Sequence, residues 1–196
     1  NAVRLARRVS PTLRIHDLGR CRLGIGSRDL AVTGVRRRAA SLLLYLVSRP
    51  RQVATREQVF DALWPDQDLE QAGNSLHQTL FFLRRELGTK STPGKPMVEY
   101  VPVEGELIYL DRELVHIDSA AFERQAREAS TKDPGSAEVL QLLQSYDGQF
   151  APEFQYEDWA IPWRDQTHGV FLELSERAAR TRIKDRPTEA AAILRH

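Results

Sequence analysis

Residues 70–88 read EQAGNSLHQTLFFLRRELG, and their apolar residues repeat at the spacing of a single helix. At about 100° per residue, one narrow stripe contains Ala72, Leu76, Leu80, Leu83 and Leu87. Such a stripe predicts a face that packs on a hydrophobic core, and Gly88 predicts the end of the helix. We therefore expect a helix over residues 70–87 with its other face outside the core.

The opposite face of this helix is predicted to be polar, with one large aromatic residue. Its members are Gln71, Asn74, Gln78, Phe81 and Arg85, with His77 and Arg84 on one flank and Phe82 on the other. Amides and arginines are the side chains that can bind base edges and phosphates in a major groove. Many polar helix faces only meet water, so the flanking elements must distinguish the two interpretations.

The residues before this helix predict a small sheet and two further helices. Short apolar segments separated by glycines indicate three or four strands of an antiparallel sheet within residues 12–33. Residues 35–48 carry an apolar stripe at helical spacing and end before Pro50. Residues 55–58, TREQ, have the form of a capping box that opens a second helix, which Pro65 ends.

The residues after it predict a hairpin. Residues 98–103 and 107–110 are two short strand-like runs around Glu104, Gly105 and Glu106. A small sheet, three helices and a terminal hairpin indicate a winged helix-turn-helix. In that arrangement the third helix enters the major groove, the second crosses the DNA backbone and the hairpin is the wing.

The second half of the chain reads as four helices with short breaks. Residues 119–130, 136–146, 158–184 and 187–195 each have a helical pattern. Paired antiparallel helices of this kind stack into solenoids. The predicted fold is therefore an α+β winged helix-turn-helix domain followed by an all-α, tetratricopeptide-like domain.

These patterns divide the chain into a lead-in or linker at residues 1–11, a winged-helix domain at 12–112 and a helical domain at 113–196. The sequence begins at Asn1 rather than at a methionine, and no polar capping helix is visible before His196. We expect the helical domain to be truncated and the sequence to be part of a longer polypeptide.

Charge is distributed unevenly between the two halves. Residues 1–95 contain 17 Lys and Arg against 8 Asp and Glu, whereas residues 96–196 contain 11 against 19. The net charges are +9 and −8. A basic half fits nucleic-acid binding, and opposite charges also favour packing of the halves against each other.

The composition and the distribution of apolar residues indicate where in the cell the protein is expected. No apolar run approaches the roughly 18 residues of a membrane span, and the start lacks the apolar core of a signal peptide. We expect a cytoplasmic protein that does not enter a membrane. The single cysteine, Cys21, excludes an intrachain disulfide and is predicted to be a small apolar strand residue.

The order of these motifs also resembles a known family. RAASLLLYLVSRP, VATREQVFDALWPD and NSLHQTLFFLRREL, within residues 38–87, resemble the response-regulator-type winged helix of SARP-like bacterial transcriptional activators. LVHIDSAAFERQ, SYDGQFAPEF and EDWAIPWRDQ, within residues 114–166, resemble the bacterial transcriptional activator domain that follows it. The resemblance implies a sequence-specific regulator with a tetratricopeptide-like second domain. The partners it implies are double-stranded DNA, RNA polymerase and a second copy of the chain on direct repeats.

The candidate DNA-binding residues come mainly from the predicted third helix. They are Asn74, His77, Gln78, Phe81, Arg84, Arg85, Thr55, Lys90 and Lys95. The amides and His77 could equally face water, and the two arginines could instead complement the helix dipole. Thr55 caps its helix first, and the free amides there can also bind phosphate. Arg36, Arg37 and Arg38 could hold phosphates or solvate the start of the first helix, and solvation is favoured.

Enzyme motifs are not found in the sequence. It has no GxxxxGK[ST], HExxH or GxSxG motif, and its five histidines are scattered. The GIGSRD segment lacks a third glycine and opens no helix, so it predicts a hairpin turn. We expect no catalytic residues, no cofactor and no metal site.

One feature departs from the pattern of DNA-binding wings. The predicted wing tip carries Glu104 and Glu106, with Glu99 nearby, and carboxylates repel phosphates. The wing is therefore expected to add little to DNA affinity. The alternative function is a winged-helix module for protein interaction on a tetratricopeptide-like scaffold.

Overall fold

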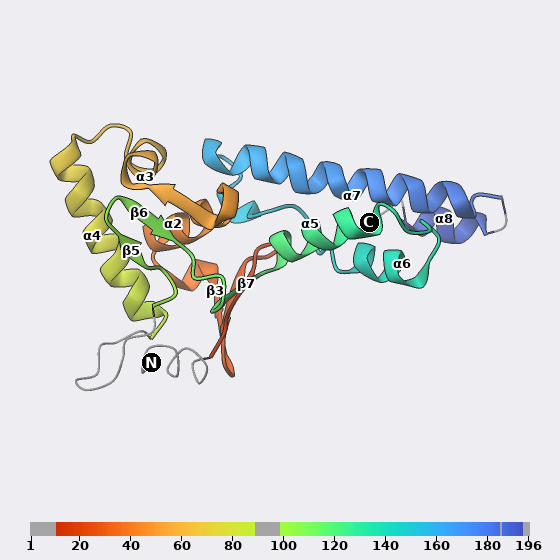
Figure 1. Ribbon diagram of the computed structural model, residues 1–196, viewed down its shortest axis with the longest axis horizontal. Coiled ribbons are helices and arrows are strands. Elements are labelled where there is room, and N and C mark those ends of the chain that lie inside the picture. Colours follow the sequence, from red (N-terminus) through yellow and green to blue (C-terminus); the bar gives the residue numbers. More distant parts are fainter. Residues whose placement is uncertain (1–10, 89–98, 185, 194–196) are drawn as a thin grey trace.

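The computed structural model describes residues 11–88, 99–184 and 186–193 of the chain (Figure 1). It has a lobe with a winged-helix arrangement at one end and a helical lobe at the other. No helix in these ranges is long and apolar enough to cross a membrane.

A four-stranded sheet lies between the two lobes. Its strands, in spatial order, are β3 (Arg28–Ala31), β2 (Arg22–Ile25), β1 (Leu13–His16) and β7 (Val115–Ile117). The first three are antiparallel, as predicted, whereas β7 runs parallel to β1. The expectation that a fourth strand would be antiparallel and local is therefore wrong. A parallel neighbour needs a long crossover, which here contains the whole set of three helices and the wing.

The three helices of the first lobe are α2 (Arg37–Val47), α3 (Arg56–Leu63) and α4 (Leu69–Glu86). The capping box of α3 is confirmed: the Gln58 amide donates to Thr55 Oγ1 at 3.2 Å, and the Thr55 amide donates to Gln58 Oε1 at 2.9 Å. The α4 helix lies one residue earlier than predicted, because the Asp68 carboxylate caps it through the Gln71 amide. Gly88 follows it with φ of 73°, a conformation that favours glycine.

Helix α2 is more buried than its single apolar stripe predicted. All its residues from 39 to 47 are buried. The reason is its position between the lobes: its Tyr45 ring meets the ring of Trp159 from the second half at 6.0 Å in a T-shaped contact. The stripe predicted one covered face of α2, whereas the contact with the second half of the chain covers a further face and leaves no local periodic signal.

The predicted hairpin is present, but its first strand is shorter than the predicted run of residues 98–103, since residues 99–102 are not in a strand; a third strand joins the hairpin. Strands β5 (Val103–Glu104) and β6 (Leu107–Tyr109) meet at Gly105, whose φ is 59°. Strand β4 (Val53–Thr55), which the sequence analysis did not predict, pairs with β6. This pairing attaches the wing directly to the start of α3.

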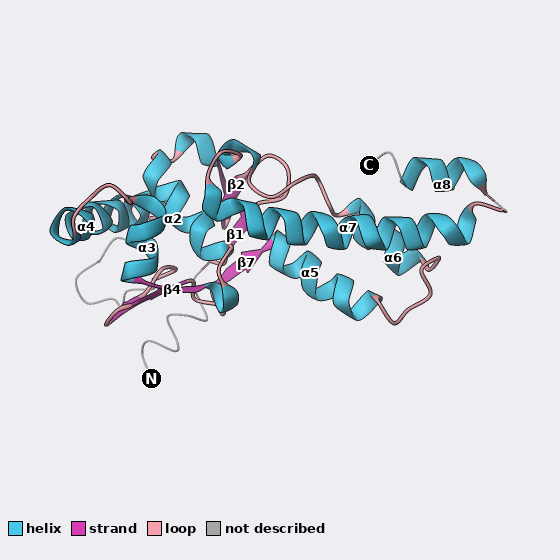
Figure 2. Cartoon of the chain, turned by 90° about the horizontal axis from the view of Figure 1, so that it is seen from above, coloured by secondary structure: helices cyan, strands magenta, loops and turns pink. Residues whose placement is uncertain are grey.

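The helical lobe contains α5 (Asp118–Ala129), α6 (Ala137–Gln144), α7 (Ile161–Arg182) and α8 (Pro187–Ile193). Short 3₁₀ helices lie at Val32–Gly34, Pro50–Gln52, Pro152–Phe154 and Asp158–Ala160. The long α7 runs beside α5 and α6 (Figure 2). Tyr146 stacks on Phe171 of α7 at 4.3 Å in the core between these helices. The four predicted helical stretches are thus present; their tetratricopeptide-like character stays a prediction.

The core of the winged-helix lobe extends into the second half of the chain, and the helical lobe encloses a second core of its own. Phe150, Phe154 and Trp159, from the second half of the chain, belong to the cluster formed by the winged-helix residues. Strand β7 also lies beyond residue 112 and completes the sheet of the first half. The core of the winged-helix lobe therefore contains residues from both sides of the boundary predicted at residue 112.

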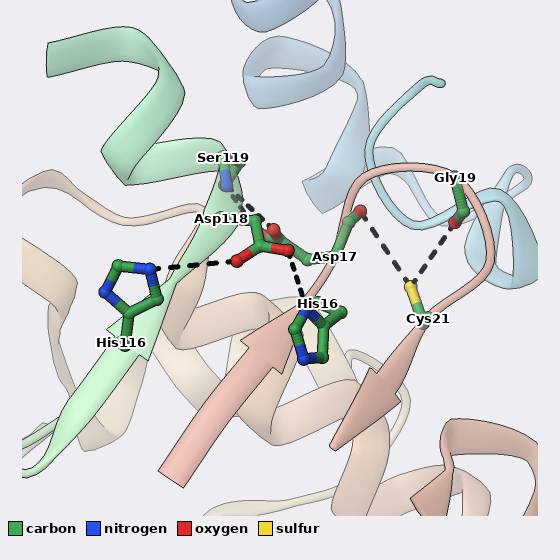
Figure 3. Close-up of polar contacts among 7 residues, drawn as sticks. All are labelled: His16, Asp17, Gly19, Cys21, His116, Asp118 and Ser119. Atoms are coloured by element: carbon green, nitrogen blue, oxygen red, sulfur yellow. Dashed lines mark hydrogen bonds and ion pairs between the residues drawn. The ribbon is translucent and has the colours of Figure 1, made fainter. Parts of the chain in front are cut away.

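Polar contacts fix the junction of β1 with α5 (Figure 3). His16 Nδ1 lies 2.8 Å from Asp118 Oδ2, and the buried Asp17 carboxylate accepts two hydrogen bonds from Ser119. Burial raises the pKa of the Asp17 carboxyl to about 7, against an ordinary value of 3.8. Cys21 is buried beside this junction, as expected for a small apolar residue, and burial raises the pKa of its thiol.

Candidate nucleic-acid interface

Helix α4 presents the two faces that its sequence predicted. Ala72, Leu76, Leu80, Leu83 and Leu87 are all buried. The exposed side carries Asn74, His77, Gln78, Phe81 and Arg85. Phe81 is 58% exposed, an apolar ring among the polar side chains of this face. The orientation of α4 leaves these side chains available to a partner.

The two arginines at the end of α4 differ in their surroundings. Arg84 forms an ion pair with Glu99, which precedes the wing. Arg85 is more exposed, and its guanidinium lies 5.1 Å from the centre of the Phe82 ring. The charge of Arg84 is therefore partly balanced by Glu99, whereas Arg85 lies 3.4 Å from the carboxylate of its neighbour Glu86. Helical spacing had placed Arg85 on the exposed face and Arg84 on its flank, but it did not predict the ion pair with Glu99.

The start of α3 is tied to the wing tip. Thr55 Oγ1 is used by the capping box, so a phosphate at this helix end would contact the backbone amides instead. The Arg56 amide donates to the Glu106 carbonyl at 2.9 Å, and Arg56 Nε donates to the Gly105 carbonyl at 3.3 Å. These bonds hold the wing tip against α3.

The wing itself is acidic in the structure as in the sequence. Tyr109 Oη donates to Glu104 Oε1 at 2.5 Å, so one of the two tip carboxylates is engaged within the hairpin. Lys90 and Lys95, predicted to contact the DNA backbone, lie outside the described residues. The described part of the wing thus offers no lysine or arginine at its tip.

Arg36, for which the sequence favoured solvation of a helix start, lies against helix α4 in the structure. Its guanidinium lies 3.4 Å from the centre of the Phe82 ring, on the flank of α4. The signal was visible as three consecutive arginines before α2, but nothing local indicated that Phe82, 46 residues later, would face the first of them. Among the described residues, no group of three or more His, Cys, Asp or Glu is arranged to hold a metal.

The winged-helix arrangement and the exposed face of α4 agree with a family match over part of the chain. Residues 33–105 match the family described as "Transcriptional regulatory protein, C terminal". This part of the chain is therefore a winged-helix domain of the kind found in transcriptional regulators, and the resemblance to SARP-like regulators is supported for this part of the chain.

A solved structure shows the same arrangement of both lobes. The chain is similar to Mycobacterium tuberculosis EmbR in complex with a low-affinity phosphopeptide, with a TM-score of 0.70 and 15% sequence identity. The match covers 94% of this chain and 49% of that one, so the chain spans about half the length of that protein. At this identity the likeness concerns the fold. A search of curated proteins gives no match.

Proposed function

We propose that the chain is a sequence-specific DNA-binding transcriptional regulator that places α4 in the major groove. The observation that carries the proposal is the exposed face of α4, where amides, a histidine, an arginine and a bare aromatic ring lie opposite a fully buried stripe. In winged-helix domains the third helix is the element that reads DNA. The match to transcriptional regulatory proteins supports this assignment.

Each exposed residue has a role that its chemistry allows. Asn74 and Gln78 can form bidentate hydrogen bonds with adenine, and Phe81 can contact a thymine methyl group. Arg85 can bind guanine or a backbone phosphate. The amides at the start of α3, beside Thr55, can bind a second phosphate.

Further features of the proposal follow from the class. A regulator of this kind would act in the cytoplasm, bind direct repeats as a dimer and contact RNA polymerase. The helical lobe would serve as a tetratricopeptide-like platform for such contacts. Reaction chemistry has no part in this proposal, since the family and the fold are those of regulators.

The experiment is a selection of bound sites from random duplex DNA, followed by affinity measurements over a range of salt concentrations. A protein that neutralises five or more phosphates should give a log–log slope of about −4.5 or steeper. Gln78→Ala should relax the preference at one base pair by about 1–3 kcal/mol. The matched control is Gln141→Ala, which removes an exposed amide from α6.

The outcomes separate the two functions. An enriched sequence motif that Gln78→Ala degrades, and Gln141→Ala does not, supports DNA recognition by α4. Failure to enrich any sequence, together with no binding at low salt, overturns the proposal. That result would favour the alternative, a winged-helix module for protein interaction.

A further inference from the structure

A pocket of about 330 Å³ lies between the start of α2 and the flank of α4. Three consecutive arginines, Arg36, Arg37 and Arg38, line one side, and Gln78 and Phe82 of α4 line the other. The first turn of α2 contains no acidic residue. The pocket is therefore a basic cavity with an aromatic wall.

The three arginines are not equally available. Arg37 pairs with Glu157 at 3.0 Å, and Arg38 donates to the Leu63 carbonyl at 2.8 Å. Within the described ranges Arg36 has no carboxylate partner; its guanidinium lies instead 3.4 Å from the centre of the Phe82 ring. Arg38 also lacks a carboxylate partner, but its guanidinium is engaged by the Leu63 carbonyl, so Arg36 is the arginine of the pocket that no protein oxygen engages within the described ranges.

The Phe82 ring contacts the guanidinium groups of two arginines. The guanidinium of Arg85 lies 5.1 Å from the centre of the same ring. Contact with an aromatic face holds a guanidinium in place while its N–H groups at the edge can still donate. The ring therefore restricts the Arg36 and Arg85 side chains before an anion binds. Less conformational entropy is then lost on binding.

The position of the pocket indicates which anion it takes. Gln78 lines the pocket and also belongs to the exposed face of α4. A helix about 10–12 Å wide nearly fills a major groove about 12 Å wide, so its flanks face the phosphate walls. The pocket lies on such a flank, next to the face assigned to the bases.

We propose that Arg36, aligned by Phe82 and assisted by Arg85, binds a backbone phosphate of the DNA strand that borders this flank of α4. The inference rests on the proposed function, since it assumes that α4 occupies the major groove. It assigns to Arg36 a binding role where the sequence pattern alone favoured solvation of a helix start. Phe82 is a positioning residue that acts through the arginines.

The first test measures affinity for the selected site and for random duplex over a range of salt concentrations. Arg36→Ala should weaken both by a similar factor, roughly three- to tenfold, and flatten the salt slope by about 0.9. Arg36→Lys should keep the slope, because the charge remains, and still lose affinity. Phe82→Leu should lower affinity with little change of slope. Arg124→Ala is the control, because it removes an exposed arginine from α5 and changes the net charge equally.

The second test replaces single phosphates of the selected site by neutral methylphosphonates. One replacement at the groove wall should weaken binding of the wild-type protein and have no further effect on Arg36→Ala. If every replacement weakens both proteins equally, Arg36 binds no phosphate and the inference is wrong.

Two controls keep the results interpretable. Thermal unfolding of each variant shows whether it is folded. If Arg36→Ala is unstable, the affinity and salt slope of Arg36→Lys still test the role of Arg36. Failure of the wild-type protein to bind DNA would overturn the proposed function itself. Normal binding with an unchanged slope in Arg36→Ala would overturn only the role of Arg36.

Discussion

Asp17, directly after strand β1, accepts hydrogen bonds from both the amide and the hydroxyl of Ser119, at 2.8 and 2.5 Å. Both residues are fully buried, and 102 positions separate them in the chain. Ser119 Oγ also accepts a hydrogen bond from Trp163 Nε1 at 3.0 Å. One buried network therefore joins the sheet, the first turn of α5 and helix α7. Satisfied buried networks of this kind specify a unique packing, so this one fixes the helical lobe on the winged helix.

The first prediction concerns the pH dependence of stability at Asp17. Burial raises the pKa of its carboxyl from 3.8 to about 7, so the folded protein holds a proton that the unfolded chain releases. The stability from this group is fully present below about pH 4 and is lost as pH rises through about 7, at up to about 1.4 kcal/mol per pH unit. Asp17→Asn should abolish this contribution. Urea unfolding of both proteins at several pH values isolates it, because all other titrating groups are shared. If the free energy of unfolding changed with pH in the same way in the wild-type protein and in Asp17→Asn, the prediction would be wrong.

The second prediction concerns the cap of α3. Thr55→Ala removes the acceptor for the Gln58 amide and should lower the free energy of unfolding by about 1 kcal/mol, within a range of about 0.5–2. Thr55→Ser keeps an acceptor at the same position and should cost much less. Chemical unfolding measures both variants. Equal losses would show that the Thr55 methyl group, rather than the hydrogen bond, stabilises this position.

The third prediction concerns shielding of the basic lobe by the acidic one. Glu157, just before the Asp158–Ala160 turn, pairs with Arg37. Deleting residues 119–196 would test shielding poorly, since it removes Phe150 and Trp159 from the core of the winged-helix lobe. Glu157→Gln should instead raise affinity for random duplex by roughly two- to threefold at low salt, because it frees one cation. Glu138→Gln on α6 changes the net charge equally and also frees a cation, Lys132, but in the helical lobe. The same increase in both variants would rule out a local effect.

The sequence predicted local patterns well and contacts between distant segments poorly. The apolar spacing of α4 gave its buried face, and TREQ gave the cap of α3, because both depend on residues within a few positions of each other. The parallel pairing of β7 with β1 and the Asp17–Ser119 bonds join segments about 100 residues apart, and such partners leave no periodic signal. The burial of α2 on all sides was missed for the same reason.

For the candidate site too, local patterns were predicted well and contacts between distant segments poorly. The exposed positions of Asn74, His77, Gln78, Phe81 and Arg85 follow from helical geometry. The pairing of Arg84 with Glu99 and the contact of Arg36 with Phe82 depend on how three separate elements pack. Amino-acid type and spacing thus identified the face of α4, with Arg85 on it and Arg84 at its flank, but could not predict the partners that rank Arg84 and Arg36.

The fourth prediction uses this ranking. Because Glu99 already balances Arg84, Arg84→Ala should weaken DNA binding and flatten the salt slope less than Arg85→Ala, whose loss should be about one unit. In a Glu99→Gln background the charge of Arg84 is released, and the effect of Arg84→Ala should grow. Affinity for random duplex over a range of salt concentrations is measured for the wild-type protein, Glu99→Gln, and each arginine variant in both backgrounds. If Arg84→Ala and Arg85→Ala have equal effects in both backgrounds, the ion pair does not restrain Arg84 on DNA.

The last prediction concerns Phe81. Its ring is 58% exposed and meets the neighbouring Phe82 at 5.5 Å in a T-shaped contact, so the described part of the second lobe does not cover it. An apolar ring among amides and arginines can contact a thymine methyl group, which distinguishes bases by shape. Phe81→Ala should therefore weaken binding to the selected site by about 1–3 kcal/mol and leave affinity for random duplex and thermal stability nearly unchanged. Leu69→Ala removes another exposed apolar side chain at the start of α4 and should alter site preference less. A drop of several degrees in the melting temperature of Phe81→Ala, with site preference intact, would instead make Phe81 a packing residue.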